Sequence, residues 1–238
     1  MRAIILAAGV GTRLSPLTNS RPKCLVPVGT RPLIDHQLAA LRTAGVDDVV
    51  MVVGYAQQQI RDHLGAGVRY VENPDYATTN SIYSLHLAAP AMDADLFLLN
   101  CDIVFHPGVL GRLRAAPVAN AVAVDERAAL VFGEMNVAYG PDQRIRAISK
   151  QLPVAEARAQ SVQVVRFSAA GARAVRDEVA RLVAAARRDV FPTSAYGPLI
   201  AAGELFAVEV GGLPWGEIDS LADYERVASE VAPLLPAS

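Results

Sequence analysis

A loop with two glycines and two basic side chains follows the first apolar run of the chain. Gly9 and Gly11 let the backbone curl tightly and present several N–H groups to an anion. Thr12 adds a hydroxyl group, Arg13 a forked guanidinium, and Lys23 an ammonium held between two prolines. Neither the dinucleotide-binding glycine pattern nor the Walker loop fits these residues. The segment therefore favours a polyphosphate site of another type, although a strand followed by Gly-x-Gly is also typical of an ordinary tight turn.

Lysine is rare in this chain. Of the 22 basic residues only Lys23 and Lys150 are lysines. An ammonium is a compact point charge, whereas a guanidinium is a broad planar fork. In an arginine-rich chain the two lysines are therefore candidates for specific anion contacts, with chance survival on the surface as the alternative.

The loop is part of a longer pattern. From Gly9 to Val28 the chain reads Gly-x-Gly-Thr-Arg-Leu-x-Pro-Leu-Thr-x-x-x-Pro-Lys-Cys-Leu-x-Pro-Val, which resembles the signature of the sugar-phosphate nucleotidyltransferase superfamily. The resemblance implies a Rossmann-like α/β fold with a mixed central sheet. It also implies Mg²⁺-dependent nucleotidyl transfer from a nucleoside triphosphate to a phosphorylated acceptor, with release of pyrophosphate. Arg13 would bind the β- and γ-phosphates, and Lys23 the α-phosphate.

A second segment narrows the resemblance. Residues 73–85 are similar to the Asn-Pro-x-Tyr-x-x-Thr-Asn-Asn-x-x-Ser-Leu stretch of small cytidylyltransferases, with Ser81 at the second Asn. Those enzymes act on phosphocholine, aminoethylphosphonate, related phosphonates and inositol phosphate. The resemblance implies that this turn lies near the base. Together with the glycine loop it gives the predicted nucleotide-binding residues, which are Ala7, Ala8, Gly9, Gly11, Thr12, Thr79, Asn80 and Ser84.

Two later segments resemble the family's metal-binding parts. Residues 99–105 are similar to the strand that delivers the first metal carboxylate, Asp102, and residues 215–224 resemble a Glu-Ile-Asp segment. In that segment Asp219 would be the second ligand of Mg²⁺, with Glu217 close by. Taken alone, Asp102 is also typical of a strand-end turn, and Asp219 of a helix N-cap. The number of metal ions stays open.

The acceptor side departs from the family's pattern. Lys150 is similar to a strand-end lysine that binds the acceptor phosphate, but Asn136 replaces a lysine and Gln163 stands where a glycine is expected. Both changes reshape the pocket and leave the acceptor's identity open. Carboxylates and aromatic rings there would suit a cationic acceptor. The predicted acceptor-binding residues are Asp125, Glu134, Asn136, Lys150, Gln163, Tyr196 and Trp215.

Composition excludes several classes of protein. The 238 residues include 24 acidic residues against the 22 basic ones, and 52% are hydrophobic, which excludes a disordered chain. The balanced charge offers no footprint for nucleic acid. No apolar run reaches the length of a membrane span, and two cysteines are too few for a disulfide scaffold. We expect a cytoplasmic protein with neither nucleic acid nor membrane as partner, and we leave a homodimer open.

The predicted secondary structure that positions these residues differs between the two halves of the chain. In the first half, strands are predicted at 2–8, 49–53, 68–71 and 95–100, and helices at 33–43, 57–64 and 79–89. This alternation indicates a parallel sheet that binds ligands beyond its carboxyl ends. The second half reads as strands at 119–124, 129–139, 144–149, 161–167 and 205–210, and as helices at 169–187, 192–202 and 220–231. We predict one domain over 1–238, in which 1–118 mainly bind the nucleotide. Residues 119–238 then form a partly antiparallel lobe that holds the acceptor and the second metal ligand.

Our first hypothesis is a Mg²⁺-dependent cytidylyltransferase. It would move CMP from CTP to a small phosphate or phosphonate of the phosphocholine, aminoethylphosphonate or hydroxyethylphosphonate type. The alternative is a sugar-1-phosphate nucleotidyltransferase that uses UTP or dTTP, against which the 76–85 stretch argues. A third hypothesis is a regulatory subunit that binds nucleotide without catalysis, and the intact Arg13, Lys23, Asp102 and Asp219 argue against it.

Overall fold

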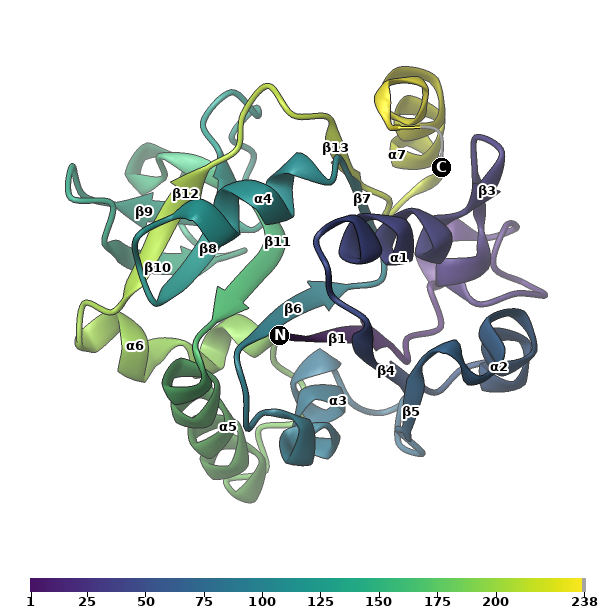
Figure 1. The fold of residues 1–238 in the computed structure, drawn as a ribbon, viewed down its shortest axis with the longest axis horizontal. Helices are drawn as coiled ribbons and strands as arrows, with labels where there is room; N and C mark the ends of the chain where they lie inside the picture. The colour runs from purple at the N-terminus through teal and green to yellow at the C-terminus, as the bar shows by residue number, and fades with distance from the viewer. Residues whose placement is uncertain (237–238) are drawn as a thin grey trace.

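The computed structural model describes residues 1–236. Its first half is built on parallel strands, with β1 in the middle between β4 and β6, and β5 beyond β4 (Figure 1). These strands are β1 (Arg2–Ala7), β4 (Asp48–Val53), β5 (Arg69–Glu72) and β6 (Leu96–Asn100). The helices between them are α1 (Leu33–Thr43), α2 (Gln57–Leu64) and α3 (Ser81–Leu87).

The second half continues the same sheet with strands that pair antiparallel, apart from one parallel pair, β12 with β8. β11 pairs with β6 of the first half, and also with β8 and β9 of the second half. The two halves of the chain, 1–118 and 119–236, therefore share one continuous sheet. The result is a mixed sheet of nine strands, in which β8 and β12 branch from β11. The added strands are β8 (Asn120–Asp125), β9 (Asn136–Tyr139), β10 (Ile145–Ser149), β11 (Ala159–Phe167) and β12 (Leu205–Glu209). The predicted α/β fold with a mixed central sheet is confirmed.

Both faces of the sheet are covered, which explains why its inner strands read as unbroken apolar runs. In β1, Ile4 and Leu6 face one buried cluster, while Ala3 and Ile5 face another. The first cluster includes side chains of α3 and α5 (Ala169–Ala184), and the second includes those of α1 and α4 (Gly108–Ala115). The sheet therefore holds the ends of its strands in fixed positions.

A small third cluster joins the C-terminal segment to the glycine loop. Strands β7 (Ile103–Phe105) and β13 (Trp215–Glu217) pair antiparallel beside it. Leu14 of the glycine loop packs with Ile218, and with Val227 from the turn of π-helix (Val227–Val231) that follows α7. This packing brings the loop after β13 against Lys23. The remaining short elements are β2 (Pro27–Val28), β3 (Arg31–Pro32), α6 (Gly197–Ala201) and α7 (Leu221–Arg226).

The structure corrects four of the predicted elements. The helix predicted at 79–89 begins only at Ser81, because the Asn80 side chain accepts a hydrogen bond from the Ser81 N–H and caps it. The strand predicted at 129–139 is confined to β9. The helix predicted at 192–202 divides into a 3₁₀ turn and α6, and that at 220–231 divides into α7 and the π-helix. Within residues 1–236 no helix combines the length and apolarity needed to cross a bilayer.

Candidate active site

The carboxyl ends of β1 and β6 open into a cavity of about 300 Å³. The glycine loop forms one wall. Gly11 has a φ of +71°, and a Cβ atom there would lie 3.2 Å from the Cβ of Lys23 and 3.3 Å from the Thr18 side chain. The Thr18 hydroxyl donates a hydrogen bond to the Gly11 carbonyl over 2.9 Å, which fixes the turn. Glycine is thus required for the loop to approach Lys23.

Most predicted nucleotide-binding residues line this cavity. They are Ala8, Gly9, Gly11, Thr12, Thr79, Asn80 and Ser84. Ala7 does not line it, since its side chain is buried within β1. Seven further residues line the cavity without having been predicted for the site: Leu6, Asn73, Tyr76, Ser81, Asn100, Cys101 and Phe191. Three of them, Asn73, Tyr76 and Ser81, lie in the 73–85 motif.

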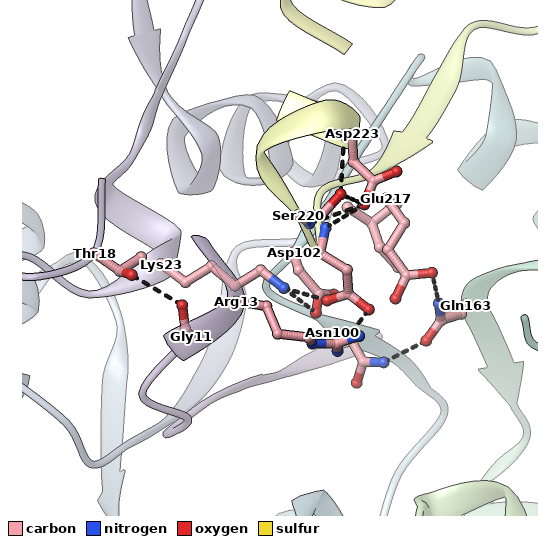
Figure 2. A network of polar contacts seen from close by, with 12 residues as sticks. Gly11, Arg13, Thr18, Lys23, Asn100, Asp102, Gln163, Glu217, Ser220 and Asp223 are labelled. Carbon is pink, nitrogen blue, oxygen red and sulfur yellow. Dashed lines mark hydrogen bonds and ion pairs between the residues drawn. The ribbon is translucent and has the colours of Figure 1, made fainter. Parts of the chain in front are cut away.

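Lys23 lies at the centre of an ion-pair cluster (Figure 2). Its ammonium donates to Asp102 Oδ2 over 2.9 Å and to Asp219 Oδ1 over 2.6 Å. Arg13, which is mostly exposed, donates to Asp219 Oδ2 over 2.9 Å. Residues far apart in the sequence thus lie together, and each cation contacts at least one carboxylate.

Burial and neighbouring charges act against each other in this cluster. Burial alone would lower the pKa of Lys23, but Asp102 and Asp219 raise that pKa well above its usual value, so the ammonium stays charged. Burial would raise the pKa of Asp219, yet mainly Lys23, with Arg13 and Lys150, lowers it to about 2. Burial and the repulsion of the two aspartates raise the pKa of Glu217 to about 8.

Asp102, Glu217 and Asp219 could together hold a metal ion. Each offers one carboxylate oxygen, and these atoms lie within 4.8 Å of one another. Among the described residues, the Oδ1 atom of Asp102 is buried and has no hydrogen-bond partner. A buried carboxylate oxygen without a donor is costly unless a cation binds it. The three oxygen donors fit a hard divalent ion such as Mg²⁺.

The turn between β5 and α3 is held by a buried amide. The Nδ2 atom of Asn73 donates to the hydroxyls of Ser84 over 3.0 Å and Thr79 over 3.3 Å. Asn73 is 1% exposed and forms part of the cavity wall, so its amide holds the two hydroxyls from within that wall. This network orients both hydroxyls at the wall.

The predicted acceptor residues are shared between two cavities. Lys150 and Gln163 line the main one, and the Lys150 ammonium lies 3.8 Å from Asp219 Oδ2 and 5.6 Å from the centre of the Phe191 ring. A second cavity, of about 410 Å³, shares Glu217 and Asp219 with the main one. The predicted residues that line it are Asp125, Glu134 and Trp215. The indole N–H of Trp215 donates to Asp125 Oδ2 over 2.8 Å.

Two predicted acceptor residues lie in neither cavity. Asn136 is fully buried, and its side chain donates to the carbonyl of Val131 over 2.9 Å. Tyr196 is 2% exposed and packs edge-on against Phe167. Its ring lines only a small apolar cavity of about 30 Å³ behind the main one. Both assignments therefore need correction, because neither side chain reaches an acceptor in the two larger cavities.

The sequence model of one protein family, described as the MobA-like NTP transferase domain, matches residues 3–188. The chain belongs to this family. The resemblance to nucleotidyltransferases that the motifs indicate is thereby confirmed.

Two curated proteins are similar to part of this MobA-like NTP transferase. It is 47% identical over 128 residues to CMP-5'-(3-aminopropyl)phosphonate synthase of Streptomyces rubellomurinus. The matched region covers 52% of this chain and 20% of that protein. The chain is 44% identical over 104 residues to choline-phosphate cytidylyltransferase of Streptococcus pneumoniae, 43% of this chain and 44% of that protein. The matched parts thus make up less than half of these curated relatives.

A solved structure extends the comparison to nearly the whole fold. It is that of CTP:phosphocholine cytidylyltransferase from Streptococcus pneumoniae, with a TM-score of 0.78 and 28% identity. The match covers 95% of this chain and 97% of that chain. The mixed-sheet fold is therefore that of a cytidylyltransferase of known structure.

Proposed function

We propose that this chain is a Mg²⁺-dependent cytidylyltransferase that moves CMP from CTP to a small phosphate or phosphonate and releases pyrophosphate. The observation that carries the proposal is the cluster of the buried Lys23 with the half-buried Asp102 and Asp219. It joins a glycine loop suited to a triphosphate on one side and Lys150 on the other. The names of the relatives support cytidylyl transfer as the chemistry.

In the proposed reaction, an oxygen of the acceptor attacks the α-phosphorus of CTP, and the bond to the bridging oxygen breaks as pyrophosphate leaves with the electron pair. Both reactants are anions, so the protein must mainly align them and offset their charge. Lys23 would stabilise charge at the α-phosphate, and the exposed Arg13 would follow the β- and γ-phosphates. Magnesium held by Asp102 and Asp219, with Glu217 beside them, would offset further phosphate charge.

The acidic second cavity supports an acceptor with a positive end. Among the described residues that line it, Arg226 is the only base, whereas five residues carry carboxyl groups: Asp125, Glu134, Glu217, Asp219 and Asp223. Trp215 adds an aromatic ring to the same cavity. Carboxylates and an aromatic face suit an ammonium group. Acceptors of the phosphocholine and aminoalkylphosphonate type therefore fit better than neutral ones.

Pyrophosphate release over a panel of triphosphates and acceptors tests the proposal. We expect release with CTP, Mg²⁺ and at least one of phosphocholine, 2-aminoethylphosphonate or 2-hydroxyethylphosphonate, and none after chelation of the metal. Release with UTP or dTTP and a sugar 1-phosphate, but not with CTP, would assign the chain to the sugar branch. No release under any combination would favour a non-catalytic nucleotide-binding role.

A further inference from the structure

Gln163 has a backbone conformation that its residue type disfavours. Its φ is +57°, in the left-handed region that favours glycine. The other described non-glycine residues with positive φ lie in turns or beside helix ends: Ala56, Gln143 and Ala186. Gln163 instead lies inside β11, where the pairing with β8 shifts register between Ser161 and Val165. Such a residue persists only where its surroundings fix it, and it points to a role for the side chain.

Both ends of the Gln163 amide are held (Figure 2). Its Oε1 atom accepts a hydrogen bond from Asn100 Nδ2 over 2.7 Å, and its Nε2 atom donates to Glu217 Oε2. The partners are an amide that donates and a carboxylate that accepts, so they fix which end of the glutamine faces which way. The side chain thus spans from the end of β6 to β13.

The bridge forms part of a wall between two spaces. Asn100, Gln163 and Phe191 line both the main cavity and the small cavity behind it. The small cavity, of about 30 Å³, has room for roughly two water molecules. Its lining is largely apolar and includes the buried ring of Tyr196. An acceptor in the main cavity cannot reach that ring while the Gln163 side chain is in place.

The acceptor's tail would meet this wall. The Lys150 ammonium, which we propose as a contact of the acceptor phosphate, lies 5.6 Å from the centre of the Phe191 ring. Phe191 is one of the three wall residues. Lys150 and Gln163 also line the same cavity, so an acceptor bound at Lys150 lies in the space that the Gln163 side chain borders.

We propose that Gln163 is a specificity-determining residue that closes an aromatic compartment around Tyr196, so that the acceptor's cationic end is left to the carboxylates of the second cavity. The inference rests on the proposed function. A glycine at this position would open the compartment, and a trimethylammonium group could then lie against the Tyr196 ring. With glutamine present, the site favours a primary ammonium such as that of 2-aminoethylphosphonate over phosphocholine.

The test compares kcat/KM for phosphocholine with kcat/KM for 2-aminoethylphosphonate in the parent and in Gln163→Gly. We expect the ratio to rise by about tenfold or more in the variant, because one methyl-sized group in an apolar pocket is worth about 10- to 200-fold. An unchanged ratio in a folded, active Gln163→Gly variant would overturn the proposal.

Two further variants separate space from other effects. Gln163→Met keeps the bulk but loses the amide, so it should keep the parent's ratio; a ratio that moves as in the glycine variant would overturn the space-filling role. Gln143→Gly is the matched control, since Gln143 has a φ of +62° in the turn between β9 and β10 and lines none of the cavities described above. Gln143→Gly should show an unchanged or raised Tm, because glycine relieves the left-handed backbone. In Gln163→Gly the loss of the two amide hydrogen bonds offsets that gain, so circular dichroism checks that this variant is folded.

The two proposals fail in different ways. A parent protein that releases no pyrophosphate from CTP with any acceptor overturns the proposed function. Binding of the same two acceptors, measured as shifts in Tm, then decides the role of Gln163 without catalysis. A larger phosphocholine shift in Gln163→Gly than in the parent supports the closed compartment, and equal shifts overturn it.

Discussion

The two sides of the main cavity are built by different means. On the nucleotide side, Lys23 is buried between two carboxylates at 2.9 and 2.6 Å, in a loop whose shape requires Gly11. On the acceptor side, Lys150 has one carboxylate contact at 3.8 Å, and Gln163 is held through its neutral amide. Charge is fixed where we expect the invariant triphosphate. On the acceptor side, where we expect relatives to bind different acceptors, packing and hydrogen bonds shape the cavity. Substitutions on the nucleotide side should therefore change kcat, and those on the acceptor side should change KM for the acceptor.

The sharpest difference is expected at Lys23. Lys23→Ala should lower kcat by about 100-fold or more, as removal of a preorganised charge at a reacting phosphate does. Pyrophosphate release measures the effect, and circular dichroism checks the fold. Arg21→Ala is the control, because Arg21 is an exposed cation of the same loop that does not line the cavity. Near-normal turnover of Lys23→Ala would remove Lys23 from the catalytic residues.

The carboxylates should report on the metal. Asp102→Asn and Asp219→Asn keep the side-chain shape but lose the charge that Mg²⁺ requires. We expect the half-saturating Mg²⁺ concentration to rise by about 10- to 100-fold, as metal-site substitutions do. Asp62→Asn, an exposed carboxylate on α2, is the control. A magnesium titration equal to that of the parent would show that these residues are not the ligands.

The base should be read on the nucleotide side alone. Cytosine and uracil differ at the 4-position, where one donates and the other accepts a hydrogen bond. The backbone at Ala8 and Gly9 and the turn at Thr79, Asn80 and Ser84 offer polar groups of fixed geometry. Mispairing a buried polar group costs about 1–3 kcal/mol, or about 5- to 150-fold. CTP should therefore exceed UTP by about tenfold or more in kcat/KM, and a preference for UTP would contradict the assignment.

The smallest effect is expected at Lys150. Its ammonium is partly accessible, and a contact of that kind is worth about 1 kcal/mol, or about fivefold. Lys150→Ala should raise KM for the acceptor by about that factor and leave KM for CTP unchanged. The control is Arg146→Ala, an exposed cation on β10. Equal changes in KM for the acceptor and in KM for CTP would mean that Lys150 does not act on the acceptor alone.

Local patterns predicted the parallel half of the fold well. The helix at Leu33–Thr43 has the expected bounds, because its apolar residues recur at helical spacing and are buried together. The glycine loop and the two segments that we expect to bind the metal could be recognised because each is continuous in sequence. The glycine loop and Asp102 meet because the neighbouring parallel strands β1 and β6 end at the same edge of the sheet. Asp219 follows β13, outside that sheet, and joins them through the packing of Ile218 and Val227 on Leu14.

The antiparallel half was harder to predict for physical reasons. Helix α4 was missed, since it is short and contains two glycines, which lower helix propensity. The apolar stretch 129–139 is strand only from Asn136, and its exposed Val131 and Phe132 lie in a loop. The pattern around Gln163 indicated a glycine, but only the structure shows the positive φ that explains it. That Tyr196 lies behind this wall depends on packing that no local pattern encodes.

The packing of the C-terminal segment on the glycine loop has a consequence for biosynthesis. Lys23 and Asp219 are 196 positions apart, so their contact closes late in any folding sequence. Polypeptides emerge from the ribosome N-terminus first, and the parallel strands with Asp102 emerge long before β13. A nascent chain can therefore hold the anion-binding loop while two of the three carboxylates are still missing. Metal-dependent turnover should begin only when the segment around Ile218 and Val227 packs against Leu14, which makes activity a direct reporter of completed folding.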